Sequence, residues 1–177
     1  MKSFQVPTRD EVSEGNQAIF DNLQKGLGFL PNLYAYYAKN ETALADYLAL
    51  QNRKSTLRGK EREVINLVVS QVNDCRYCQS AHTAIGKMNG FTDEQILEIR
   101  GGSASFDAKL DALAKFVKDI TLHRSKPSPE VVENLFAAGY TEAHLVDIIM
   151  VIGDKIISNF IHGATQLPID FPLAPEL

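Results

Sequence analysis

Residues 63–82 read EVINLVVSQVNDCRYCQSAH, and this stretch indicates two helices joined by a short turn. Four apolar residues of its first half recur at the spacing of one buried helix face: Val64, Leu67, Val68 and Val72. Asn73-Asp74 interrupts that helix, and Asp74 is expected to cap a second helix that carries Cys75, Cys78 and His82. The stretch therefore predicts a helical hairpin with both cysteines in its second arm.

Helical periodicity continues on both sides of the hairpin, and no segment shows the sustained alternation of a strand bounded by hairpin turns. Besides the cysteine helix, the expected helices cover residues 8–26, 41–52, 60–72, 92–101, 106–120, 128–139 and 141–163. Residues 28–32 are expected to form a rigid connection. A chain of 177 residues can close one sizeable core, so the sequence predicts a single all-α domain over residues 1–177.

A short internal echo relates residues 90–96, GFTDEQI, to residues 139–145, GYTEAHL. Two readings are open. The echo is the trace of a duplicated helical unit, or it is a common combination of a glycine turn with a threonine cap. Under duplication, Ile156 and Asn159 fall where the cysteines lie in the first unit, and only that first unit is catalytic.

Composition excludes several functional classes. The net charge is −4 and the basic residues are scattered, so no nucleic-acid partner is expected. Pro7, Arg9 and Asp10 interrupt any apolar core of a secretory signal, and the most apolar stretch, 145–152, contains Asp147 and is too short to cross a bilayer. We therefore expect a cytoplasmic protein without a membrane partner.

The two cysteines of the chain stand in one Cys-x-x-Cys motif, which restricts them to a local redox, metal-binding or packing role. Cys75, Cys78 and His82 are spaced so that all three lie on one helix face. Cys75 is nearer the positive helix end, but Cys78 has His82 at i+4 as a base, which makes Cys78 the better candidate for attack. Glu63 folds back across the hairpin to orient His82 or to shuttle a proton. Once Cys78 is a sulfenic acid, Cys75 is close enough to form a disulfide with it.

Plainer interpretations compete for each of these residues. A His on a helix is more often a satisfied structural residue than a base. Glu63 belongs to the charge run 61–63 at a helix start, which is typical of a solvated face. Tyr77 is more often a packing aromatic than a catalytic acid, so only an accessory role is considered for it.

The pattern E-x11-C-x2-C-x3-H from Glu63 to His82 resembles the alkylhydroperoxidase D and carboxymuconolactone decarboxylase-like superfamily, in its peroxidase-related branch. Residues 28–32, residues 57–61 and Asn159 agree with this resemblance. It implies an all-helical fold of the alkylhydroperoxidase D type that assembles as trimers or hexamers. It also implies that Cys78 is the peroxidatic cysteine, Cys75 the resolving cysteine, His82 the base and Glu63 the relay carboxylate.

The resemblance has one departure, because the characterised peroxidase of the family has a His where this chain has Tyr77. The decarboxylase branch lacks the cysteine pair, so decarboxylation is not expected. The sequence thus predicts a thiol peroxidase that acts on a small hydroperoxide, with a dithiol reductant for which a lipoyl-type dithiol is one candidate. No cofactor and no metal are expected.

Two alternatives stay open at this stage. Glu63, Cys75, Cys78 and His82 together offer the donor set of a zinc site. In the second alternative, the chain is a non-enzymatic helical oligomerisation or interaction module with a vestigial thiol pair. The presence of Tyr77 between the cysteines supports this interpretation. Residues 145–152 are apolar almost all round their helix, which by itself predicts a homo-oligomer.

Overall fold

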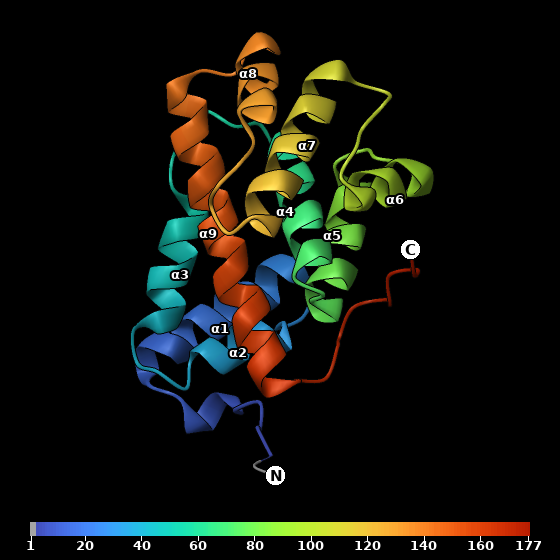
Figure 1. Cartoon of the computed structure of the whole chain (residues 1–177). Helices are drawn as coiled ribbons and strands as arrows, with labels where there is room; N and C mark the ends of the chain where they lie inside the picture. Colours follow the sequence, from blue (N-terminus) through green and yellow to red (C-terminus); the bar gives the residue numbers. More distant parts are fainter. Residues whose placement is uncertain (1–2) are drawn as a thin grey trace.

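The computed structural model describes residues 3–177, and these form a single-domain bundle of helices without a strand (Figure 1). In chain order the elements are the 3-10 helix η1 (Arg9–Glu11), α1 (Glu14–Leu27), α2 (Asn32–Tyr37), α3 (Ala43–Asn52), α4 (Gly59–Val72), α5 (Arg76–Met88), α6 (Asp93–Gly101), α7 (Ala108–Leu122), α8 (Pro129–Ala137) and α9 (Glu142–Thr165). The predicted all-α class is confirmed.

Helix α4 is the centre of the bundle, and it packs against α5, α6, α7 and α9. Its apolar residues are fully buried on more than one side of the helix: Val64, Ile65, Leu67, Val68 and Val69. Because neighbours surround it, polar residues of the same helix are also removed from water, among them Glu63 and Asn66. The expected solvated face over residues 61–63 is therefore wrong for Glu61 and Glu63, which are both buried.

The turn between α4 and α5 differs from the prediction in one residue. Asp74 has a φ of 50°, in the left-handed region, and it turns the chain instead of capping the next helix. Cys75 then takes the N-cap position, with its backbone N–H bonded to Ser70 O at 2.9 Å and its sulfur accepting a hydrogen bond from the N–H of Cys78. The thiol thus replaces the side-chain oxygen that usually caps a helix.

Two further boundaries depart from the prediction. Thr8 and Glu11 do form a capping box, but it caps the short η1, and α1 begins only after Ser13 accepts from the N–H of Asn16. The segment after Gly28 is followed by the additional short helix α2. The predicted helix after Thr92, stopped at Gly102, is confirmed.

The echoed segments share their local structure. Gly90 and Gly139 both have positive φ, and a capping box follows each of them at Thr92 and Thr141. The helices that follow differ, since α6 has 9 residues and α9 has 24. A shared turn and cap accounts for the echo, and duplication stays a prediction.

The N-terminal helices and the C-terminal tail close around the start of α5. One apolar cluster joins α4 to α6, α7, α8 and α9, and a second joins α1–α3 and the tail to both cysteines. The tail runs back from the end of α9 beside α5 (Figure 1), where Ala174 N–H donates to Ser80 Oγ at 3.1 Å and Arg100 donates to the carbonyl of Pro175 at 2.7 Å.

Within residues 3–177 no single helix is long and apolar enough to cross a membrane, and only α8 and α9 taken together, across a bend of 119°, meet that length and composition.

Asp147 fastens α9 to the loop between α3 and α4. Its buried carboxylate pairs with Arg53 and accepts hydrogen bonds from the hydroxyl of Ser55 and from both the N–H and the hydroxyl of Thr56. Burial would raise the pKa of Asp147, but these donors outweigh it and hold the pKa far below its usual value.

We expect Asp147→Asn to lower the free energy of unfolding by about 1–3 kcal/mol, because hydrogen bonds to a charged acceptor are lost and Arg53 loses its partner. Since the folded-state pKa is lowered, this contribution is fully present above the ordinary value of 3.8 and is lost as the pH falls through the folded pKa. Urea unfolding at pH 7 and at acidic pH measures it. Asp46→Asn, at an exposed position of α3, is the control, and an equal loss in both variants would contradict the role of Asp147.

Candidate thiol active site

The α4–α5 hairpin brings Glu63 and His82 into direct contact. His82 Nδ1 lies 2.8 Å from Glu63 Oε2, and both side chains are buried. The other carboxylate oxygen of Glu63 accepts a hydrogen bond from Asn66 Nδ2 at 2.9 Å. The pair expected across the hairpin is thus present in the structure.

The charges of this pair follow from their surroundings. Burial raises the pKa of Glu63, but His82, Asn66 and the charge of Lys155 together hold it below its usual value. Burial and the charge of Lys155 lower the pKa of His82, although Glu63 acts in the opposite direction. At neutral pH Glu63 is a carboxylate and His82 is neutral. Nδ1–H of His82 then donates to Glu63, which leaves Nε2 as the ring nitrogen that can accept a proton.

The cysteines form the second unit of the site. Cys75 caps α5 and Cys78 lies in its first turn, both thiols are free, and their residues are only 3% and 2% exposed. The backbone N–H of Cys78 donates to the sulfur of Cys75 at 3.3 Å. The two sulfurs therefore lie at the positive end of the same helix, where a thiolate is favoured.

The two thiols differ in acidity. A hydrogen bond from Cys75 lowers the pKa of Cys78 to about 7 in spite of burial, with help from the charge of Lys155 and from Asn159 and Ser158. The hydrogen bond with Cys78 and burial raise the pKa of Cys75. The helix N–H that points at Cys75 favours an anion there, but the α9 side chains act on Cys78. We therefore assign the negative charge to Cys78.

The cysteine pair and the Glu63–His82 pair share the hairpin, but no hydrogen bond joins the two pairs among residues 3–177. Over the described chain, no hydrogen bond joins His82 to either sulfur, although the i+4 spacing predicted that His82 would reach Cys78. Proton transfer between Cys78 and His82 consequently needs a carrier between them, which a bound substrate can supply.

Tyr77 joins the start of α5 to the N-terminal helices and the tail. Its hydroxyl oxygen accepts from the N–H of Leu33 at 3.2 Å, and its ring packs against His162 and Phe171 at 5.2 and 5.6 Å between centroids. Burial raises the pKa of Tyr77. These contacts favour a packing role over an accessory catalytic one.

Sequence analysis missed the polar side chains that α9 contributes. Asp154, Lys155, Ser158 and Asn159 are all buried on a helix that is otherwise strongly apolar. Asn159 was noted as a flanking feature of the resemblance and as the counterpart of a cysteine position under duplication, but not as part of the site. The signal was available, because polar residues one turn apart on a buried helix face, such as Lys155 and Asn159, are rare unless they have partners.

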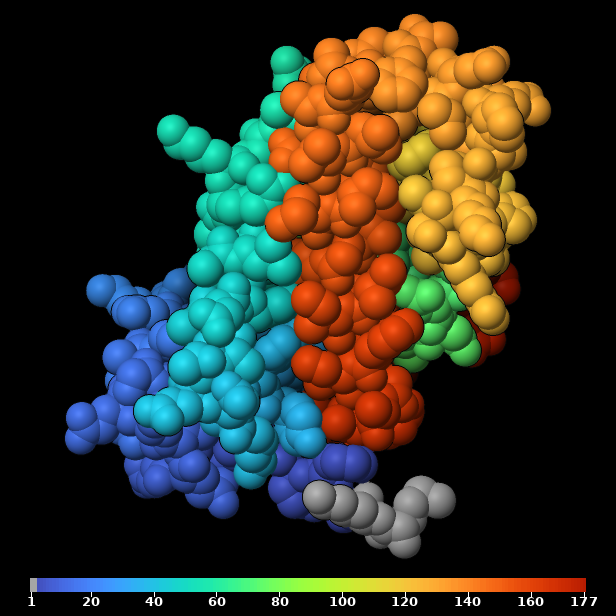
Figure 2. Space-filling model, turned by 60° about the vertical axis from the view of Figure 1, so that its left-hand side comes forward, coloured from blue at the N-terminus to red at the C-terminus, as the bar shows by residue number. Residues whose placement is uncertain are grey.

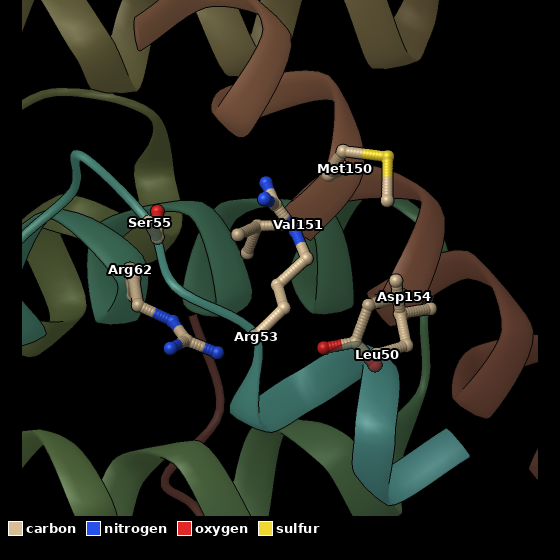
Figure 3. Close-up of a pocket in the computed structure, with 7 residues that line it drawn as sticks. All are labelled: Leu50, Arg53, Ser55, Arg62, Met150, Val151 and Asp154. Atoms are coloured by element: carbon tan, nitrogen blue, oxygen red, sulfur yellow. The ribbon is translucent and has the colours of Figure 1, made fainter. Parts of the chain in front are cut away.

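A small cavity adjoins the site on the α9 side. It has a volume of about 10 Å³ and is lined by Leu50, Arg53, Ser55, Arg62, Met150, Val151 and Asp154 (Figure 3). Asp154 connects it to a buried polar chain, since Gln51 Nε2 lies 3.4 Å from Asp154 and Gln51 Oε1 accepts from Tyr34 at 2.8 Å. A wider cleft of about 450 Å³ lies near the start of α4, around Gly59 and Lys109, and neither cysteine lines it.

The donor set proposed for zinc is not assembled. In the part of the chain that the structure describes, no three His, Cys, Asp or Glu residues are grouped to hold a metal ion. The zinc alternative therefore has no geometric support.

Comparison with known proteins supports the resemblance that the sequence of the hairpin indicates. The model of the carboxymuconolactone decarboxylase family matches residues 37–119, which include the whole α4–α5 hairpin. A peroxidase-related protein from Silicibacter sp. TM1040 is 26% identical, with a TM-score of 0.81 over 94% of this chain and 90% of that one. The matched residues and this likeness support the alkylhydroperoxidase D and carboxymuconolactone decarboxylase-like superfamily that the sequence resembles.

Two more distant structures share the fold. A peroxidase-related protein from Ralstonia eutropha JMP134, with an alkylhydroperoxidase D core, is 20% identical with a TM-score of 0.84 over 94% of this chain and 91% of that one. The debrominase Bmp8, in a variant form in complex with 2,3,4-tribromopyrrole, is 17% identical with a TM-score of 0.78 over 96% and 93%. At these identities the likeness shows the fold alone.

We expect Tyr77→Phe to lower the free energy of unfolding by about 1–3 kcal/mol, because the N–H of Leu33 loses its acceptor in a buried place. The alkylation rate of Cys78 at pH 7 should stay unchanged, since the Tyr77 hydroxyl bonds away from the sulfurs. Urea unfolding and iodoacetamide labelling measure the two effects, with Tyr36→Phe as the control on α2. A large loss of thiol reactivity without a loss of stability would restore the accessory role.

Proposed function

We propose that the protein is a Cys-x-x-Cys thiol peroxidase that reduces a small hydroperoxide. Cys78 is the attacking thiolate, Cys75 resolves the product, and His82 with Glu63 relays the proton. The observation that carries this proposal is the lowered pKa of Cys78, about 7, next to a second free thiol in the same helix turn. A thiol of that acidity is substantially thiolate at neutral pH and is the form that attacks peroxides.

The attack step balances within this set of groups. The Cys78 thiolate forms a bond to the terminal oxygen of ROOH, and the O–O bond breaks as its electron pair leaves with RO⁻. When substrate binds to the form in which Cys78 is still a thiol, the thiol proton passes through the substrate to Nε2 of His82, and the transient imidazolium returns it to RO⁻ to give ROH. Glu63 fixes the ring and stabilises the transient imidazolium through the 2.8 Å hydrogen bond to Nδ1.

Resolution and reset complete the cycle. The thiol of Cys75 attacks the Cys78 sulfenic acid, which forms the disulfide and releases water. An external dithiol then reduces the disulfide by exchange and is itself oxidised to a disulfide. A lipoyl-type dithiol fits this step, and we propose the cytoplasm as the compartment because it keeps such thiols reduced.

The test is peroxide consumption with dihydrolipoamide as the electron source. We expect turnover by the wild type, and a loss of two hydrogens in the mass of peroxide-treated protein without reductant. Cys78→Ser should abolish consumption, whereas Cys75→Ser should still form one sulfenic acid per chain before turnover stalls. Trapping a sulfenic acid in Cys78→Ser but not in Cys75→Ser would reverse the two roles. No turnover with any dithiol would favour a non-enzymatic module.

The relay is tested on the same step. His82→Ala should slow single-turnover sulfenic-acid formation by about 10²–10⁴-fold, as for a lost general base. Glu63→Gln keeps the shape of the side chain but removes the charge that stabilises the imidazolium. Its effect should not add fully to that of His82→Ala, because groups that act as one unit are non-additive. Full additivity in the double variant would separate Glu63 from His82.

We propose a homo-oligomer as the functional assembly, and the outer face of α9 supports it. Five apolar residues of that helix are exposed along one side: Val146, Ile149, Met150, Ile157 and Phe160. Figure 2 shows α9 uncovered along this side of the molecule. Val146 and Phe160 are 63% and 66% exposed, and a continuous apolar stripe of this kind is typical of an interface. The stripe fits a second copy of this chain, because the resemblance implies trimers or hexamers.

Light scattering at micromolar concentration should give a mass that is a multiple of the 19.6 kDa chain mass. Phe160→Asp places a charge in the apolar stripe and should shift the mass toward the monomer. Leu122→Asp changes a comparably exposed leucine at the end of α7 and serves as the control. A stable wild-type monomer would remove the proposal.

A further inference from the structure

Two polar side chains of α9 are buried against the hairpin without an assigned role. Lys155 and Asn159 lie one turn apart, and each residue is only 3% exposed. Helix α9 packs against both α4 and α5, so this face of α9 meets the hairpin. A buried amide or ammonium costs free energy unless a partner stabilises it, and the partner of each group therefore indicates its function.

Asn159 is held in one orientation by the hairpin turn. Asn73 Nδ2 donates to Asn159 Oδ1 at 3.0 Å, which directs the amide nitrogen of Asn159 away from Asn73. That nitrogen is buried and has no hydrogen-bond partner among residues 3–177, so it is free to donate to a group that enters or changes charge in the site. Asn159 is one of the groups that lower the pKa of Cys78, which indicates the sulfur of Cys78 as that group.

Lys155 is a buried cation without a salt bridge to any carboxylate that the structure describes. Its charge nevertheless acts on all four groups of the site. It lowers the pKa of Cys78, Cys75, Glu63 and His82. A cation that faces four titratable groups but is fixed to none of them by an ion pair stabilises whichever of them carries negative charge.

The other ionisable groups around Cys78 do not supply that charge. They are Tyr34 and Tyr37 from α2, Tyr47 from α3, Glu63 from α4, Cys75, Tyr77 and His82 from the α5 segment, and Asp154 from α9. Burial raises the pKa of each of the tyrosines, so they are neutral, and His82 is neutral as well. None of these groups is a cation, so Lys155 is the basic side chain that acts on Cys78.

We infer that Lys155 and Asn159 form a cradle on α9 that holds the sulfur of Cys78 as an anion, with Asn159 as a hydrogen-bond donor to the reacting sulfur and Lys155 as the positioning charge. The inference rests on the proposed function for its role in catalysis. It also explains why the two cysteines differ, because the helix N–H serves Cys75 while α9 serves Cys78.

The experiment measures the pH dependence of iodoacetamide alkylation in a Cys75→Ser background, where Cys78 is the only thiol and residue 75 keeps an O–H donor. We expect Lys155→Met to raise the apparent pKa by about one unit or more, which slows alkylation at pH 7 by about fivefold or more. Lys155→Arg should keep the profile of the parent. Asn159→Asp has nearly the same shape but replaces the donor by a carboxylate, and it should also raise the apparent pKa. Lys126→Met removes one exposed charge from the α7–α8 loop and is the matched control.

Circular dichroism and thermal melting show which variants are folded. An unchanged profile in Lys155→Met, or an equal shift in Lys155→Arg, would overturn the role of Lys155. If Lys155→Met does not fold, an unchanged profile in folded Asn159→Asp overturns the cradle instead. Because alkylation uses no peroxide, the result is independent of turnover. A shifted pH profile of alkylation in a protein that consumes no peroxide would contradict the proposed function but would still support the cradle.

Discussion

The left-handed turn at Asp74 is the constraint on which the candidate site depends. The turn ends α4 and delays the start of α5 by one residue compared with a helix capped by Asp74. Cys75 therefore becomes the N-cap, and its sulfur accepts a hydrogen bond from the N–H of Cys78. The same turn sets the angle at which α5 returns along α4, and this return places His82 against Glu63. Asn73, next to the turn, reaches across to Asn159 of α9. Three separate contacts of the site thus follow from a single backbone conformation.

Burial of charge in this site is tolerated because the groups stabilise one another. Desolvation opposes the anionic forms of Glu63 and Cys78, and each is offset by hydrogen bonds and by the common cation Lys155. Burial and the same cation keep His82 neutral, and a neutral imidazole is the form that can act as a base. A site arranged in this way has a thiolate and a base together near neutral pH, which a solvated Cys and His at these positions would not provide.

Helix α9 has two different faces, and they serve two proposed purposes. The inner face contributes Lys155, Ser158 and Asn159 to the thiols, whereas the outer face is an exposed apolar stripe from Val146 to Phe160. A partner copy seated on the stripe would hold α9 in place from outside. Asp147 and the C-terminal tail, bound to Ser80 and Arg100, fix the two ends of this part of the molecule from within the chain. The position of the cradle relative to the hairpin is therefore determined by contacts on several sides of α9.

The sequence alone determined the helical class, the hairpin, and the pairing of Glu63 with His82, because helical periodicity and the spacing of residues 63–82 are local properties of the chain. It also ranked Cys78 above Cys75, but for an incomplete reason. The i+4 base makes no hydrogen bond to the sulfur, and besides the neighbouring Cys75 the groups that lower the pKa of Cys78 lie about 80 positions further along the chain, on α9. The N-cap role of Cys75 and the packing role of Tyr77 were also decided only by tertiary structure. Periodicity shows which residues share a face of one helix, but the electrostatic environment of a buried sulfur depends on distances to other helices, and only the packed bundle sets those distances.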